Sequence, residues 1–225
     1  MLSNEQNLYL DKFHELEDLL VKGKNKSFSD ILNETKNIFP QEEQAFLKTC
    51  NHVRNILSHG KQENFIIPTP YLIQRLDKII QIFTKTAWDI STKNIYFKRI
   101  SDLLLPTIKD MKEKIYTHVP ILDDNNLLVG VLSESSVFNY IANQEEIILD
   151  LRNSKISDLI NELNIKRSNE SFEFVPRNMP MIELKDIFYK KIENKERLGA
   201  IFVTENGKTS EKILGIITSW DMYSF

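Results

Sequence analysis

The feature that most constrains the fold is an internal repeat in the second half of the chain. The stretch VPILDDNNLLVGVLSESSVF, residues 119–138, returns in altered form as AIFVTENGKTSEKILGIITSWDMY, residues 200–223. Each copy reads as a strand, an acidic or Asn-containing turn, a second strand through Gly130 or Gly215, and a polar turn that enters a helix. Two strands and one helix cannot enclose a core alone, so the two copies are expected to pack against each other.

The residues around the two copies extend each of them into a longer β-α repeat. Apolar residues at helical spacing precede each copy: Ile108, Met111 and Ile115 before the first, and Met181, Leu184, Ile187, Phe188 and Ile192 before the second. A strand-like FEFV at 172–175 stands ahead of the second helix, whereas the candidate ahead of the first is Leu103–Leu105. One more helix is expected between the copies, from Ile156, Leu159, Ile160 and Leu163. The sequence predicts repeat one at about 95–145 and repeat two at about 155–225.

The first part of the chain predicts helices instead. Apolar stripes with helical spacing run from Leu8 to Leu20, Phe28 to Ile38, Phe46 to Leu57 and Tyr71 to Trp88. Pro40 is expected to close the second helix, and Gly60 is a natural residue to end the third. Helices with short connections form a bundle. The expected fold class is α + α/β, with an all-α helical bundle over residues 1–92 and the α/β repeats over 93–225.

Charge and cysteine content narrow the classes of partner. The formal net charge of −3 gives no global basic field for DNA, RNA or an anionic membrane. Cys50 is the only cysteine, which excludes an intramolecular disulfide and a multi-cysteine metal site and fits a reducing compartment. The N-terminal residues show no signal-peptide pattern, and no apolar run approaches the roughly 18–20 residues that cross a bilayer. A cytoplasmic protein without a membrane or metal partner is expected.

The exit of the second copy carries the clearest candidate chemistry. A strand ending in Gly215–Ile217 delivers Thr218 to the start of a helix, where backbone N–H groups are unsatisfied and the dipole favours anions. Thr218 can donate its hydroxyl to a phosphate, and Asp221 can accept from ribose hydroxyls. The same pair also has the outline of a capping box, which is common at any helix start. Both readings stay open at this point.

The exit of the first copy differs at one of these two positions. Ser133 keeps a hydroxyl where the second copy has Thr218, but Ser136 replaces the aspartate. The ribose contact is therefore lost on that side, which predicts one functional cleft rather than two.

Residues 95–225 resemble a tandem pair of CBS domains, the cystathionine β-synthase-type regulatory module. The matching stretches are MKEKIYTHVPILDDNNLLVGVLSESSVF and FYKKIENKERLGAIFVTENGKTSEKILGIITSWDM, with a VPI entry and a G-[IV]-[IL]-[ST]-x-x-[DS] exit. The resemblance implies that the two repeats assemble as one disc. It further implies that the clefts between them hold an adenine nucleotide (AMP, ADP or ATP) or a related adenosyl ligand.

The same resemblance implies a set of nucleotide-binding residues. It assigns Thr218 and Asp221 the phosphate and ribose contacts, and places His118 and Pro120 near the segment that contacts the base. Val175 and Arg177 fall on the leading strand of repeat two, from which Arg177 can reach a phosphate. Ala200 and Ser133 complete the candidates. The alternative for Arg177 and His118 is an ordinary exposed side chain.

Residues 41–60, with HVRNILSHG inside them, resemble the HEPN superfamily of small helical domains. Active members of that superfamily carry an R-x4–6-H motif and cleave RNA without a metal, and Arg54 and His59 fit the spacing. A histidine can act as general acid or base towards the 2′-OH while a cation stabilises the phosphate. The alternative is a helix end, where cations favour the dipole and Gly60 stops the helix.

These features lead to one main functional hypothesis and two others. The first is a regulatory protein whose CBS pair binds an adenosyl ligand and transmits its presence to the helical domain, as a homodimer. The second is a metal-independent endoribonuclease, toxin- or defence-like, gated by the CBS pair, with RNA as a partner only if Arg54 and His59 are active. The third is an interaction module in which both sites are degenerate.

Overall fold

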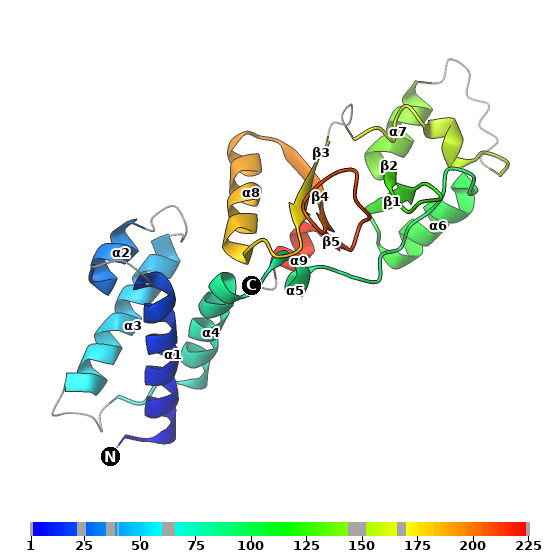
Figure 1. Cartoon of the computed structure of the whole chain (residues 1–225). Coiled ribbons are helices and arrows are strands. Elements are labelled where there is room, and N and C mark those ends of the chain that lie inside the picture. Colours follow the sequence, from blue (N-terminus) through cyan, green and yellow to red (C-terminus); the bar gives the residue numbers. More distant parts are fainter. Residues whose placement is uncertain are drawn as a thin grey trace. The chain divides into compact units, whose positions relative to one another are not determined.

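The computed structural model describes residues 2–21, 26–34, 39, 41–59, 66–143, 152–165 and 170–223. The chain divides into two compact units: one is Met1–Lys85 with Pro180–Ile182 and Phe225, and the other is Thr86–Met179 with Glu183–Ser224. The sequence placed this division slightly later, between residues 92 and 93. The coarse prediction of a helical region followed by an α/β region is confirmed (Figure 1).

The regular elements described over residues 2–85 of the first unit are all helices. Its helices are α1 (Asn4–Val21), α2 (Phe28–Glu34), α3 (Gln41–His59) and α4 (Pro70–Thr84). Helix α1 packs against each of the other three and supplies the buried Tyr9, Phe13 and Leu16 (Figure 1). The Tyr9 hydroxyl donates to the backbone carbonyl of Cys50 at 2.6 Å, so this buried polar group is satisfied. The resemblance to the HEPN superfamily stays a prediction.

The end of the fourth helix differs from the sequence prediction. Helix α4 stops at Thr84, and Trp88 lies in a separate short helix, α5 (Ala87–Ile90). The reason is a second helix cap, because the backbone N–H and the hydroxyl of Thr86 both donate to Asp89 at 2.8 Å. Pro40 and Gly60, the predicted ends of the second and third helices, lie outside the described residues, as does Ile38.

Repeat one consists of a helix, a two-stranded hairpin and a second helix. The elements are α6 (Leu104–Lys114), β1 (His118–Leu122), β2 (Leu128–Ser133) and α7 (Glu134–Ala142), with β1 and β2 antiparallel. The prediction of a leading strand at Leu103–Leu105 is wrong, because α6 begins at Leu104 and Leu103 makes only an isolated bridge with Lys155. The backbone instead forms an isolated parallel bridge between Lys98 and Ile121.

Repeat two contains the larger sheet. Its elements are β3 (Glu170–Pro176), α8 (Met181–Glu193), β4 (Arg197–Thr204), β5 (Gly215–Ile217) and α9 (Ser219–Tyr223). The strand order is β3-β4-β5, with β3 parallel and β5 antiparallel to β4. The helix predicted over 156–163 is shorter, a 3-10 helix η2 (Ile156–Leu159). The segment before α6 holds the start of η2, since the N–H groups of Ile156 and Ser157 donate to the carbonyls of Asp102 and Ile100.

The two repeats share apolar contacts, and their glycines permit close backbone approach. Val131 of β2 is buried in one cluster with Ala200 and Phe202 of β4. A Cβ on Gly130 would lie 2.4 Å from the carbonyl oxygen of Leu163, and a Cβ on Gly215 would lie 2.4 Å from the Ser91 hydroxyl. Any larger residue at either position would displace its neighbour.

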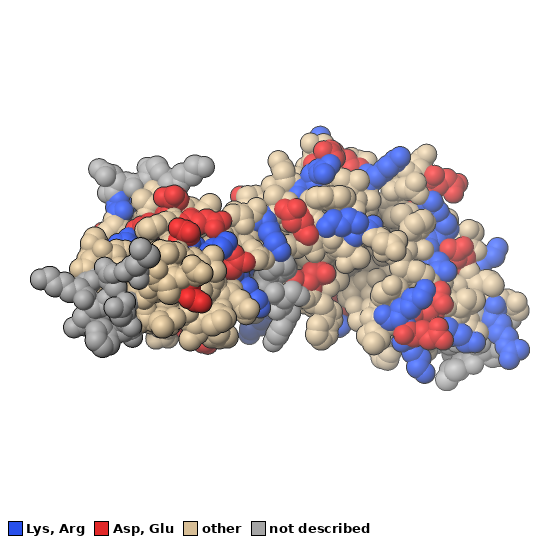
Figure 2. Space-filling model, turned by 90° about the horizontal axis from the view of Figure 1, so that it is seen from below, with Lys and Arg blue, Asp and Glu red and all other residues tan. Residues whose placement is uncertain are grey.

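Charge and helix hydropathy add two observations. On the face drawn in Figure 2, basic and acidic side chains are interspersed, so that face carries no extended basic patch for nucleic acid. Among the described helices, none has the length and apolar character needed to cross a membrane.

Candidate nucleotide site

The candidate site is a cleft of about 240 Å³ between the two repeats. Its lining comes from three places: the segment after α5 with Thr92 and Asn94–Tyr96, the end of α6 and start of β1 with Lys114–His118 and Pro120, and the end of β5 with Ile216, Thr218, Trp220 and Asp221. The cleft brings together the start of the first hairpin and the end of the second. Four predicted residues therefore meet in one cleft: His118, Pro120, Thr218 and Asp221.

Thr218 and Asp221 form a helix cap that uses only one of the two carboxylate oxygens of Asp221. Both the backbone N–H and the hydroxyl of Thr218 donate to Oδ2 of Asp221, at 2.7 and 2.9 Å. The other carboxylate oxygen, Oδ1, has no hydrogen-bond partner among the described residues. The two interpretations, a helix cap and a ligand contact, are thus compatible. Oδ2 of Asp221 can hold the cap while Oδ1 accepts a hydrogen bond from a ribose hydroxyl.

Helix α9 does not supply a strong anion site by itself. It spans only five residues, Ser219–Tyr223, so the dipole expected at Thr218 from the sequence is weak. The positive group of the cleft is the side chain of Lys114, at the last turn of α6. Sequence reasoning missed Lys114, although it lies four residues before His118 in the quoted KIYTHVP stretch.

Aromatic rings form a second part of the wall, and two of them, Tyr96 and Tyr116, were not predicted from the sequence. The rings of Tyr96 and Tyr116 lie 5.2 Å apart at 35°, and the Lys114 amine lies 4.7 Å from the centre of the Tyr96 ring. Burial, and then the hydrogen bond that its hydroxyl donates to Asp110, raise the pKa of Tyr96 well above its usual value. Trp220 stands at the rim and is 79% exposed. These flat faces suit a stacked base.

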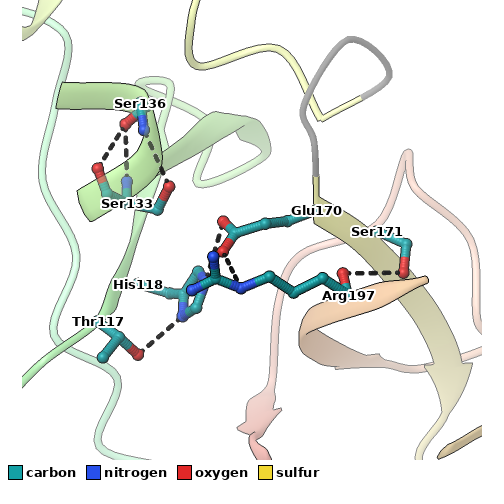
Figure 3. Close-up of polar contacts among 7 residues, drawn as sticks. All are labelled: Thr117, His118, Ser133, Ser136, Glu170, Ser171 and Arg197. Atoms are coloured by element: carbon teal, nitrogen blue, oxygen red, sulfur yellow. Dashed lines mark hydrogen bonds and ion pairs between the residues drawn. The ribbon is translucent and has the colours of Figure 1, made fainter. Parts of the chain in front are cut away.

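His118 links the cleft to a buried carboxylate of repeat two (Figure 3). Its Nδ1 lies 2.8 Å from the Thr117 hydroxyl, and its Nε2 lies 3.2 Å from Oε2 of Glu170 on β3. Arg197, at the start of β4, reaches the other oxygen of Glu170 with its Nε at 3.1 Å. The side chain of Glu170 is 1% exposed and that of Arg197 is 68% exposed, so Arg197 covers the carboxylate from the solvent side.

The exit motif of repeat one uses its polar groups internally. Ser133 donates its backbone N–H to the Ser136 hydroxyl at 2.8 Å, and that hydroxyl donates to the Ser133 carbonyl at 2.8 Å (Figure 3). The Ser133 hydroxyl accepts from the N–H of Ser136 at 3.2 Å, and both serines are 4% exposed. Ser133 and Ser136 occupy the sequence positions of Thr218 and Asp221, but neither lines the cleft.

Besides Ser133, three further predicted residues lie away from the cleft. Val175 on β3 and Ala200 on β4 are core residues, each 1% exposed. The guanidinium of Arg177 lies 4.8 Å from the Trp88 ring and pairs with Glu205 at 3.5 Å. The structure therefore brings none of these three side chains to the lining of this cleft.

In the helical unit, Arg54 and His59 are not brought together. Arg54 forms an ion pair with Glu17 of α1, and its guanidinium lies 5.4 Å from the Phe13 ring. His59 is the exposed last residue of α3. The helix is continuous, so positions five apart point roughly 140° away from each other. The ribonuclease hypothesis gains no support from this arrangement.

A search for metal sites over the described residues finds no group of three or more His, Cys, Asp or Glu side chains that could hold a metal ion.

Comparison with known families supports the assignment of repeat one. Residues 87–143 match the family described as CBS domain. The match covers α5, α6, the β1–β2 hairpin and α7, the elements that carry one wall of the cleft. The predicted CBS resemblance is confirmed for this part of the chain. No curated protein matches the sequence.

The chain is also similar to solved structures of CBS domains, at low identity and with TM-scores below 0.5. CBSX2 in complex with AMP is 22% identical over 62% of this chain and 93% of that chain, with a TM-score of 0.44. The CBS domain of the bacterial CNNM/CorC family Mg²⁺ transporter in complex with the inhibitor IGN95a is 16% identical over 82% and 95%, with a TM-score of 0.49. The CBS domain pair of MJ0100 with 5′-methylthioadenosine and S-adenosyl-L-methionine is 16% identical over 62% and 94%, at 0.43. The bound molecules are properties of those proteins.

Proposed function

We propose that this chain is a regulatory protein that binds an adenine nucleotide (AMP, ADP or ATP) or a related adenosyl ligand in the cleft between its two CBS-like repeats. The observation that carries the proposal is the composition of this one cleft. A carboxylate oxygen of Asp221 without a partner among the described residues, the amine of Lys114 and the aromatic rings of Tyr96, Tyr116 and Trp220 line the same space. Together they match the three parts of a nucleotide.

Each part of the ligand has a chemically suited group in this proposal. The base stacks on the exposed aromatic surface, which is worth about 1–3 kcal/mol per base in nucleic-acid sites. Oδ1 of Asp221 accepts from a ribose hydroxyl, and such charge-assisted hydrogen bonds are stronger than neutral ones. The Lys114 amine pairs with a phosphate or with another anionic group of the ligand.

The proposal places one ligand on each chain. The position related to Asp221 by the repeat is Ser136, whose hydroxyl is buried and bonded within its own cap. This feature supports a single functional cleft.

The regulatory part of the proposal concerns what the ligand changes. The helical unit receives the signal, and the protein works as a homodimer in which ligand binding alters contacts between chains. The support is the composition of the chain, in which the unit that holds the candidate ligand cleft is joined to a separate helical unit.

A thermal-shift panel tests the proposal. Because a ligand that binds only the folded state stabilises it by RT ln(1 + [L]/Kd), about 2.7 kcal/mol at a hundred times Kd, a binding nucleotide raises Tm clearly. AMP, ADP, ATP and S-adenosylmethionine are compared with uridine monophosphate as the control. If none of the adenosyl compounds raises Tm more than the control does, the proposed function is wrong.

A further inference from the structure

The charge of the nucleotide cleft limits which adenosyl compounds it can hold. Lys114 is the only lysine or arginine among the described residues that line the cleft, and Asp221 is the only acidic residue among them. These two charges balance each other. A phosphate monoester carries about −1.5 to −2 charges at pH 7, and each further phosphate adds to this. The cleft therefore compensates one phosphate in part and a chain of phosphates much less.

The surroundings of Lys114 weaken its charge further. The amines of Lys114 and Lys98 lie 4.7 and 5.2 Å from the centre of the Tyr96 ring. The hydroxyl of the same ring donates to Asp110, and Lys98 pairs with this carboxylate at 3.8 Å. The hydrogen bond from Tyr96, and then the nearby charge of Lys114, lower the pKa of Asp110. Asp110 thus offsets part of the positive charge that Lys114 presents to the cleft.

The groups that the sequence assigned to a phosphate have other partners. The backbone N–H and the hydroxyl of Thr218 both donate to Oδ2 of Asp221, at 2.7 and 2.9 Å. Arg177 pairs with Glu205 at 3.5 Å and does not line the cleft. Helix α9, which follows Thr218, has only five residues, so its dipole adds little positive potential. None of these groups compensates a second or third phosphate.

The size and polarity of the cleft match the nucleoside part of a ligand. Its volume of about 240 Å³ is below the ~300–1,000 Å³ of typical pockets for drug-sized ligands. The aromatic rings of Tyr96, Tyr116 and Trp220 suit a base, and Oδ1 of Asp221 suits a ribose hydroxyl. The negative charge of the same carboxylate repels any phosphate that comes close to it.

We propose that the cleft selects adenosyl compounds with at most one phosphate, such as AMP and adenosine, over ADP and ATP. This inference rests on the proposed function and narrows its ligand class. Selectivity is a difference of affinities, and here it comes from the uncompensated charge of the additional phosphates. We expect the dissociation constant of ATP to be at least ten times that of AMP, with ADP between the two.

Isothermal titration of the full chain with adenosine, AMP, ADP and ATP, in buffer without divalent cations, tests the selectivity. Raising the salt concentration should narrow the gap between AMP and ATP, because salt screens charge repulsion. If ATP binds as tightly as AMP or more tightly, the selectivity is wrong and the proposed function stands. If none of the four compounds binds, the proposed function falls and this inference falls with it.

Three variants test whether charge is the cause. Lys114→Gln should weaken AMP at least threefold and adenosine by less, because only AMP has a phosphate for the amine. Lys109→Gln is the matched control, since Lys109 is an exposed lysine of α6 outside the cleft, and its affinities should not change. Asn94→Lys adds a second cation at an exposed position of the cleft wall, so it should strengthen ATP at least threefold more than adenosine.

Circular dichroism confirms that the three variants fold. An Asn94→Lys chain in which the affinities for ATP and adenosine change by the same factor would overturn the charge argument. The same conclusion would follow if Lys114→Gln weakened adenosine as much as AMP.

Discussion

His118 of repeat one lies 3.2 Å, from Nε2 to Oε2, from the buried carboxylate of Glu170 in repeat two. Arg197 reaches the same carboxylate at 3.1 Å from the solvent side. The connection joins the wall of the nucleotide cleft to the first strand of the second sheet. A charge taken out of water needs such partners, because an uncompensated buried carboxylate is expensive.

The first prediction compares the two ends of the Glu170–Arg197 pair. Arg197→Ala should lower the free energy of unfolding by about 2–3 kcal/mol, because it removes the cation paired with a buried carboxylate. Glu170→Ala should cost about 1 kcal/mol, since the exposed guanidinium of Arg197 is hydrated once the carboxylate is gone. Urea denaturation measures both. A loss at Arg197 no larger than the loss at Glu170 would contradict this account.

The second prediction concerns the close approach at Gly130. Gly130→Ala should destabilise the protein by about 2–3 kcal/mol, because its Cβ would meet a backbone carbonyl at 2.4 Å and the backbone must move. Gly199→Ala is the comparison: its nearest neighbours are the ring atoms of Phe172 and His118, at 2.7 and 3.0 Å, which can shift more easily. Thermal melting with both variants checks the order. A milder effect at Gly130 than at Gly199 would contradict it.

The third prediction is a pH dependence in the turn between β4 and β5. Glu211 accepts hydrogen bonds from the side chain and the backbone N–H of Asn206, which lower its pKa to about 2. A carboxyl whose pKa is lower in the folded state stabilises the protein above its ordinary value of 4.5, and this contribution is lost as the pH falls towards about 2.

Glu211→Gln tests this sign. The variant should melt at a lower temperature than the original protein at pH 7, and the difference should shrink steadily between pH 4.5 and the lowest pH at which both still fold. Glu193→Gln is a suitable control, since Glu193 is an exposed acid at the end of α8, outside this turn. A Tm difference that stays constant over this range would contradict the assignment.

The fourth prediction is the number of ligands on each chain. Isothermal titration with AMP should give one site per chain, because Ser136 stands in the position of Asp221 and its hydroxyl is bonded within its own cap. A stoichiometry of two would contradict the single cleft.

Much of the α/β unit was predictable, because it follows from local pattern. The hairpins around Gly130 and Gly215 and the helices that precede them appear in the alternation and spacing of apolar residues. The fourth helix ends at Thr84 and not at the predicted Trp88, because the cap at Thr86 starts a new helix. The spacing of apolar residues does not reveal such a polar cap. The strand predicted at Leu103–Leu105 is absent for a related reason: an apolar triplet alone does not distinguish a strand from a helix.

The candidate site was predictable only where the repeat points to it. Thr218 and Asp221 stand out as the second copy of an exit motif, and His118 and Pro120 lie beside the first hairpin. Tyr96 and Lys114 come to the cleft from segments without a motif, because the path of the chain between the elements decides what meets there. The pairing of His118 with Glu170, 52 residues apart, is a tertiary contact of the same kind.

The most direct measurement is the affinity for AMP of the original protein and of Asp221→Asn, by isothermal titration. Asp124→Asn is the control, because Asp124 is an exposed aspartate in the β1–β2 turn outside the cleft. The proposed site predicts a dissociation constant about ten to a hundred times higher for Asp221→Asn, the effect of losing one hydrogen bond to a charged group. Asp124→Asn should bind like the original protein. AMP binding that is equally tight in all three proteins would contradict the site.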